Sequence, residues 1–183
     1  MGKLRFIHAA DLHLDSPFRG LAETSTALRD RLQSATFQAL DRIVTHAIDS
    51  TSDFVLLAGD LYDSRDRSLR ALVEFRRQME RLEERDIGAY VVHGNHDPLN
   101  GWGSEFKMPA NVLTFDGDVA AQPVIRDGRE VARITGISYT KERVTDNLAR
   151  SFQRTLGDVY SIALLHANIG HQSGHADYAP APM

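Results

Sequence analysis

The sequence has no cysteine and no apolar run long enough to cross a membrane. The absence of cysteine among its 183 residues excludes a disulfide framework and thiolate metal ligands. A membrane-spanning helix needs about 18 or more consecutive apolar residues, and a secretory signal needs an apolar core ahead of the first structural element. Neither pattern is found, so we expect a soluble protein of the cytoplasm.

The chain also lacks an excess of positive charge. Its formal net charge is −4, so the totals give no sign of the basic surface with which many proteins bind nucleic acid. Any affinity for phosphate groups would have to come from a few local side chains or from bound cations. With 42% hydrophobic residues, the chain can bury one sizeable core, and we expect a single domain over residues 1–183.

Four apolar segments of the sequence each end in side chains that can bind a metal ion. Phe54–Ala58 is typical of a strand buried on both faces, and Gly59 ends it. The other three segments are Leu4–Ala10, Ala89–His93 and Ser161–Leu165. The side chains delivered after the four segments are Asp11, His13, Asp60, Asn95 and His166. Placed side by side in one sheet, these strand ends would bring the side chains to a single edge.

Such a group of side chains favours divalent cations. Asp11, Asp60, Asp63 and Asp97 would repel one another in a partly desolvated cleft unless cations neutralised their carboxylates. Carboxylate, amide and imidazole ligands without thiolate select Mn²⁺, Mg²⁺ or Fe²⁺, with Zn²⁺ as a further option. A carboxylate such as Asp60 can bridge two ions about 3.5–4 Å apart, which then clamp a phosphoryl group and activate a water.

The remaining pattern indicates an α/β protein. Apolar residues recur at helical spacing from Leu28 to Ile48, and the segment 64–68 is expected to open a second helix. The inward-facing residues of that second helix are expected to be Leu69, Leu72, Phe75, Met79 and Leu82. A third helix is expected over Lys141–Leu156, and Asp127-Gly128 between two apolar runs predicts a β-hairpin. We expect βαβαβ winding first, then antiparallel strands that complete a second sheet.

Three arginines follow Asp63 near the predicted metal edge, and they are candidates for contacts with phosphate. These are Arg65, Arg67 and Arg70. The arginines and glutamates of the later helical turns are instead typical of a solvated face with opposite charges three and four residues apart.

The set of motifs is more specific than any one of them. Asp-x-His at 11–13 is followed by Gly-Asp-x-x-Asp at 59–63, Gly-Asn-His-Asp at 94–97 and a strand-terminal histidine at 166. With this set the sequence resembles the calcineurin-like metallophosphoesterases, and within them the bacterial DNA-repair exonucleases of the SbcD and YhaO type. The opening Ala10–Leu21 looks most like the YhaO branch, as does Gly174-His175 followed by Tyr178-Ala179-Pro180.

The resemblance implies an αββα sandwich of mixed sheets with helices on the outer faces. It also implies that Asp11 and His13 hold a first metal ion, Asp60 bridges, and Asn95 and His166 hold a second. The favoured ion would be Mn²⁺, with Mg²⁺, Fe²⁺ or Zn²⁺ as alternatives. His96 would protonate the leaving oxygen or stabilise the transition state, and Asp97 would orient His96.

The implied function is a metal-dependent phosphodiesterase, a DNA exonuclease in repair, in which a metal-activated hydroxide attacks the phosphodiester. The implied partners are DNA, an SMC-like ATPase and a second copy of the chain. Two alternatives stay open. The first alternative is a phosphatase or a cyclic-nucleotide phosphodiesterase. Such enzymes share this sheet edge, and the fold alone does not determine the substrate. The second alternative is an inactive domain that binds little metal and serves in protein interactions.

The second alternative follows from a departure from the family pattern. The Gly-His-x-His motif, which supplies one histidine to each metal, does not occur in this sequence. His171 and His175 are four residues apart with no strand between them, so they are poor substitutes. We therefore expect residues 1–183 to be the N-terminal portion of a metallophosphoesterase domain, truncated before its last ligand motif, and this form can be inactive.

Overall fold

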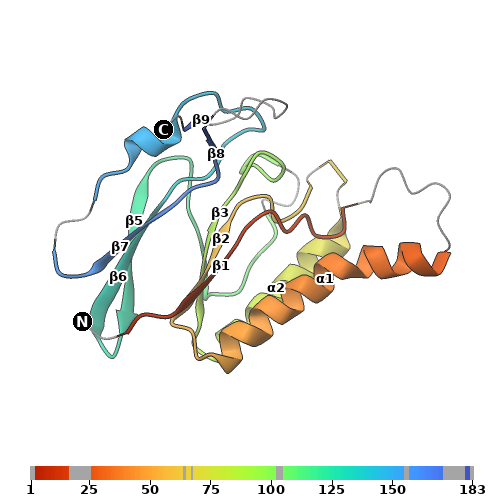
Figure 1. The fold of residues 1–183 in the computed structure, drawn as a ribbon, viewed down its shortest axis with the longest axis horizontal. Helices are drawn as coiled ribbons and strands as arrows, with labels where there is room; N and C mark the ends of the chain where they lie inside the picture. The colour runs from red at the N-terminus through yellow and green to blue at the C-terminus, as the bar shows by residue number, and fades with distance from the viewer. Residues whose placement is uncertain are drawn as a thin grey trace.

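The computed structural model describes residues 3–16, 26–63, 65–66, 68–101, 105–154, 157–170 and 180–181. Its first half contains β1 (Phe6–Ala9), α1 (Thr26–Asp49), β2 (Phe54–Ala58), α2 (Leu69–Glu83), β3 (Gly88–Val92) and β4 (Val112–Thr114). Its second half contains β5 (Ala120–Arg126), β6 (Arg129–Gly136), the 3₁₀ turn η1 (Leu148–Ser151), β7 (Tyr160–Leu164), β8 (Asn168–Ile169) and β9 (Pro180–Ala181) (Figure 1). Neither of the described α-helices has the length and apolar character that crossing a membrane requires.

The first sheet is parallel throughout, with the strand order β1-β2-β3-β4. In its register, Val55 of β2 lies opposite Ile7 of β1 and Ala89 of β3. All of β2 is buried, as its unbroken apolar sequence predicts. Because the strands are parallel, the chain leaves β1, β2 and β3 at the same edge, which is where the predicted ligands follow.

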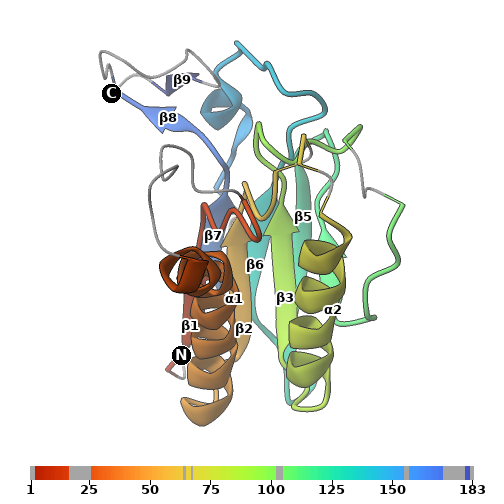
Figure 2. The same cartoon turned by 90° about the vertical axis from the view of Figure 1, so that its right-hand side faces the viewer.

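Both described α-helices pack on one face of the first sheet (Figure 2). α1 buries Phe37, Leu40, Val44 and Ala47 at helical spacing, which confirms the predicted stripe from Leu40 onward. α2 begins after Ser68, whose hydroxyl oxygen accepts the N–H of the third helical residue at 3.0 Å. The helices, together with the inner face of the sheet, form one apolar core.

The second sheet covers the other face of the first. Its order is β5-β6-β7, with β5 and β6 antiparallel and β6 and β7 parallel (Figure 1). The predicted hairpin is confirmed, and its turn residues Asp127 and Gly128 both have positive φ, 52° and 71°, as a two-residue turn between twisted strands requires. Phe54, Leu56 and Ala58 point into a second apolar core between the sheets. The α/β class with two packed sheets is therefore confirmed.

The arrangement differs from expectation at several points. β7 does not join the first sheet; it lies beside β6 in the second sheet. The outer face of the second sheet carries no α-helix among the described residues, since both described α-helices lie on the first sheet.

The expected helix over Lys141–Leu156 is reduced to the four residues of η1 in the part that the structure describes. Val144 and Thr145 are β-branched, and Asp146 and Asn147 favour turns and helix starts over helix interiors. Leu69 is 59% exposed rather than inward. At about 100° per residue it is turned away from the centre of the apolar stripe on α2.

Candidate metal centre

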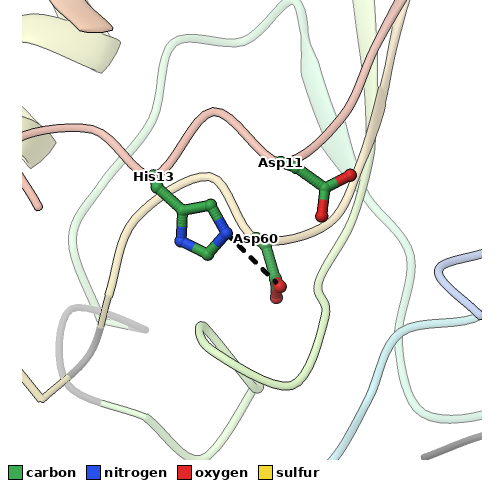
Figure 3. Close-up of side chains that lie close together, drawn as sticks. All are labelled: Asp11, His13 and Asp60. Atoms are coloured by element: carbon green, nitrogen blue, oxygen red, sulfur yellow. Dashed lines mark ion pairs between the residues drawn. The ribbon is translucent and has the colours of Figure 1, made fainter. Parts of the chain in front are cut away.

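Asp11, His13 and Asp60 lie together at the carboxyl edge of the first sheet (Figure 3). Each offers a ligand atom within 4.8 Å of the others, and His13 Nε2 is 3.8 Å from Asp60 Oδ2. The loops after β1 and β2 run side by side here. Asp11 N donates to the carbonyl of Gly59 at 3.1 Å, and His13 N donates to that of Asp60 at 3.0 Å. These backbone bonds fix both loops close to the sheet that carries them.

The backbone at all three residues is left-handed. φ is 54° at Asp11, 41° at His13 and 53° at Asp60. A residue with a side chain pays roughly 1–2 kcal/mol for this conformation, and such positions cluster where function demands a particular side-chain direction. Three neighbouring residues with positive φ at one sheet edge therefore indicate a functional site.

His166 and Asn95 complete the group from the other side of Asp60. His166 Nε2 lies 3.2 Å from Asn95 Oδ1 and 3.4 Å from Asp60 Oδ2. The Nδ1–H of His166 donates to the carbonyl of Ala58 at 2.9 Å. That bond fixes the ring and leaves Nε2 facing the site, as is usual for a ligand histidine. Although β7 belongs to the second sheet, it delivers His166 to the same place as predicted.

Two glycines make room for this packing. A Cβ at Gly94 would come within 2.3 Å of Asp60 Oδ1 and 2.8 Å of His166 Cδ2. A Cβ at Gly59 would come within 2.7 Å of the His166 ring, and Gly59 also has φ of +82°. Because real Cβ atoms essentially never approach so closely, glycine at both positions is a condition for bringing Asp60 and His166 together.

The electrostatics of the buried pair favour a positive charge. Burial by itself lowers the pKa of His166, but hydrogen bonding to Asp60 and the Asp60 charge outweigh it and raise that pKa to about 9. Burial raises the pKa of Asp60, but the same interactions with His166 leave it below its usual value. A field that holds a proton on His166 would also favour a cation there. The oxygen and nitrogen donors fit divalent ions, and Asp60, between the two groups of ligands, fits the bridging position.

His96 stands beside this group. Its ring lies edge-on to the His13 ring with centroids 4.9 Å apart, and its Nδ1–H donates to Asp63 Oδ2 at 3.2 Å. The side chain is 41% exposed, so it can reach a molecule bound at the edge. The sequence places Asp63 among the acids of the site but gives no signal that it is the partner of His96.

Asp97 does not have the contact expected of it. Instead of orienting His96, its buried carboxylate accepts three backbone N–H groups. These come from Asp60 at 3.0 Å, Leu61 at 2.9 Å and Gly94 at 2.8 Å. His93 Nδ1 also lies 3.3 Å from Asp97 Oδ2. Asp97 therefore ties the loop after β2 to the loop after β3, and Asp63 takes the position at His96.

The candidate phosphate-binding arginines are partnered within the chain. Arg65 makes a two-pronged pair with Glu142, at 2.7 and 3.4 Å. Arg70 lies 3.7 Å from Asp15 Oδ1 and over the Phe37 ring. Both side chains remain largely exposed. Arg67, like His171 and His175, lies outside the described residues.

Comparison with known proteins shows the family to which the chain belongs. A model of the family described as calcineurin-like phosphoesterase matches residues 4–180. The uncharacterized metallophosphoesterase YhaO of Bacillus subtilis is 38% identical over 178 residues, which is 97% of this chain and 44% of that protein. The DNA double-strand break repair protein Mre11 of Thermoplasma acidophilum is 30% identical over 156 residues, 79% of this chain and 38% of that protein.

The Mre11 protein of Methanosarcina acetivorans is 33% identical over 95 residues, 52% of this chain and 14% of that protein. The chain thus spans less than half the length of these relatives. Since the family model covers nearly all of it, the chain belongs to the calcineurin-like phosphoesterase family.

Proposed function

We propose that this protein is a metal-dependent phosphodiesterase that cleaves DNA, a nuclease with an exonuclease role in repair. One observation carries the proposal: the ends of strands from two different sheets bring oxygen and imidazole donors together around the buried Asp60. The proposed metal ligands are Asp11, His13, Asp60, Asn95 and His166.

The chemistry is divided between the ions and the chain. Two divalent ions bound there, Mn²⁺ in the first instance, would polarise a phosphoryl group and activate the attacking water. His96, exposed at the edge and held through Nδ1 by Asp63, would donate a proton from Nε2 to the leaving oxygen. Asp63 would orient the ring through its Nδ1–H, which is the role expected of Asp97 from the sequence.

DNA as the substrate is supported by the relatives. Two of those described above are named as DNA double-strand break repair proteins, and hydrolysis of a phosphoester is the shared chemistry of the family. Arg65 and Arg70, whose side chains are largely exposed, would contact the phosphate backbone by exchanging their carboxylate partners for phosphate, because ion pairs with an exposed partner are worth little. An SMC-like ATPase, a second copy of the chain and a cytoplasmic location remain part of the proposal on the resemblance alone.

The test separates the alternative functions. The protein with saturating Mn²⁺ is incubated with linear duplex DNA, single-stranded DNA, a phosphomonoester and a cyclic nucleotide, with an EDTA-treated sample as control. We expect cleavage of DNA that EDTA abolishes. Hydrolysis of only the monoester or the cyclic nucleotide would replace the nuclease with a phosphatase or a cyclic-nucleotide phosphodiesterase. No turnover, with weak or single Mn²⁺ occupancy by calorimetry, would instead identify an inactive interaction domain.

A further inference from the structure

Ser138 and Tyr139 follow the end of β6 by two and three residues and contact His93, just after the end of β3. Their side chains are buried, at 2% and 0% exposure. The approach depends on Gly136 at the end of β6, where a Cβ would lie 2.4 Å from the Phe115 ring. The chain from the second sheet therefore passes close against the end of the first sheet.

The two residues bind both backbone groups of His93, the residue before the Gly94–Asp97 motif. The His93 N–H donates to Ser138 Oγ at 3.0 Å, and the Tyr139 N–H donates to the His93 carbonyl at 3.0 Å. The Ser138 hydroxyl in turn donates to the carbonyl of Phe115 at 2.5 Å. Ser138 is thus hydrogen-bonded on both sides, and its hydroxyl has a fixed direction.

Tyr139 also holds the far end of the same loop. The N–H of Leu99 donates to the Tyr139 carbonyl at 2.9 Å. The residues on either side of the loop 94–98, His93 and Leu99, are therefore both hydrogen-bonded to the backbone of Tyr139. The Tyr139 ring packs edge-on against the His166 ring, with centroids 5.7 Å apart and planes at 76°. Tyr139 therefore contacts the base of the loop that carries Asn95 and also the imidazole that faces Asn95.

The other half of the site is held in a different way. Asp11 and His13 are fixed by backbone bonds to the loop after β2, and the N–H of Leu14 donates to the carbonyl of Leu61 at 2.8 Å in the same ladder. That ladder belongs to the first sheet. The two halves of the site are therefore supported by different segments and meet at Asp60.

We propose that Ser138 and Tyr139 are positioning residues for the half of the metal centre formed by Asn95 and His166. The inference rests on the proposed function, since it concerns the proposed ligands. Removing a support behind a metal ligand typically weakens metal binding by about 10–100-fold. Loss of the Ser138 or Tyr139 side chain should therefore weaken the binding of the ion at Asn95 and His166 and leave the binding of the ion at Asp11 and His13 unchanged.

The experiment compares Ser138→Ala and Tyr139→Leu with a matched control, Ser52→Ala. Ser52 is also buried, at 5% exposure, and its hydroxyl lies 2.9 Å from Ser50 Oγ, but it precedes β2 at the opposite end of the sheet. Ser138→Thr keeps the hydroxyl and serves as the rescue. Mn²⁺ binding is titrated by calorimetry and by the electron paramagnetic resonance of the bound ion, and amide hydrogen exchange of residues 94–99 is measured without metal.

We expect Ser138→Ala and Tyr139→Leu each to weaken one Mn²⁺ site at least tenfold. Ser138→Ala should also speed exchange in the loop, because it removes the acceptor of the His93 N–H, whereas leucine at 139 keeps the backbone bonds to His93 and Leu99. Ser52→Ala should change neither Mn²⁺ binding nor loop exchange, even if it lowers the melting temperature as much as Ser138→Ala does. Ser138→Thr should restore Mn²⁺ binding. Equal Mn²⁺ binding and equal loop exchange in Ser138→Ala and Ser52→Ala would overturn the inference, as would an equal loss at both ions. If the unaltered protein binds no Mn²⁺, the proposed function fails and the metal-free exchange alone decides the positioning role.

Discussion

Gly94 offers a direct test of the packing around the Asp60 carboxylate. In Gly94→Ala the new methyl group would lie 2.3 Å from Asp60 Oδ1 and 3.0 Å from Asp60 Cγ, far inside van der Waals contact. Asp60 is held by the N–H of His96, which donates to the same Oδ1 at 2.9 Å, so relief requires moving Asp60 or the loop of His96. Either movement pulls a proposed ligand out of place.

The magnitude follows from overpacking of a buried site. Inserting a methyl group into a well-packed region costs about 1–3 kcal/mol, and each 1 kcal/mol lowers the melting temperature of a domain this size by about 2–4 °C. We expect a fall of about 4–8 °C for a cost near 2 kcal/mol, with Mn²⁺ affinity lowered by about tenfold or more. Differential scanning calorimetry and Mn²⁺ titration measure the two effects.

Gly88 provides the matched control on the same strand. It opens β3, whereas Gly94 follows its end, and a Cβ there meets its nearest atom at 3.6 Å, which is ordinary contact. Gly88→Ala should leave Mn²⁺ affinity unchanged and stability unchanged or slightly higher, since alanine reduces the freedom of the unfolded chain. If Gly94→Ala and Gly88→Ala melt alike and bind Mn²⁺ alike, the close packing of Gly94 on Asp60 is not a condition of the site.

Further changes probe the other contacts. Asp97→Asn should lower the free energy of unfolding by about 2–4 kcal/mol in urea denaturation, because an amide N–H₂ would face backbone donors in a buried position; a stability loss under 0.5 kcal/mol would contradict its role as the tie between two loops. His96→Ala should lower kcat by about 10²–10⁴-fold and keep Mn²⁺ binding, and metal loss in this variant would make His96 a ligand. His166→Ala should lose Mn²⁺ affinity, which calorimetry would detect, whereas unchanged titration would remove it from the ligand set. Gly128→Ala should cost about 1 kcal/mol through its positive φ alone, since no atom lies within 4 Å of the added Cβ, and unchanged thermal melting would argue against that turn.

Several elements of the fold were predictable because their signals are local. An unbroken apolar strand such as Phe54–Ala58, a 3.6-residue stripe in α1 and Asp127-Gly128 between two apolar runs each have one common structural solution. The convergence of Asp11, His13, Asp60 and Asn95 was predictable because they follow parallel strands of one sheet, which end at one edge.

The remaining features depend on partners distant in the sequence. The spacing of apolar residues does not say whether Ser161–Leu165 joins the first or the second sheet, because both are buried environments for a strand. The difference between Asp63 and Asp97 is likewise tertiary. The two carboxylates have the same chemistry, and only the crossing of the loops after β2 and β3 places one beside His96 and the other beneath three backbone N–H groups.

The division of the proposed site between two sheets determines how it would lose its ligands during partial unfolding. Of the five proposed ligands, His166 follows a strand of the second sheet, whereas Asp11, His13, Asp60 and Asn95 follow strands of the first sheet, which packs on the helices. Local fraying of β7 would withdraw one imidazole and leave the other four in register, because the first sheet is also held by the apolar core that it shares with the helices. Heat or mild denaturant should therefore produce a folded state with reduced ion occupancy before the whole chain unfolds.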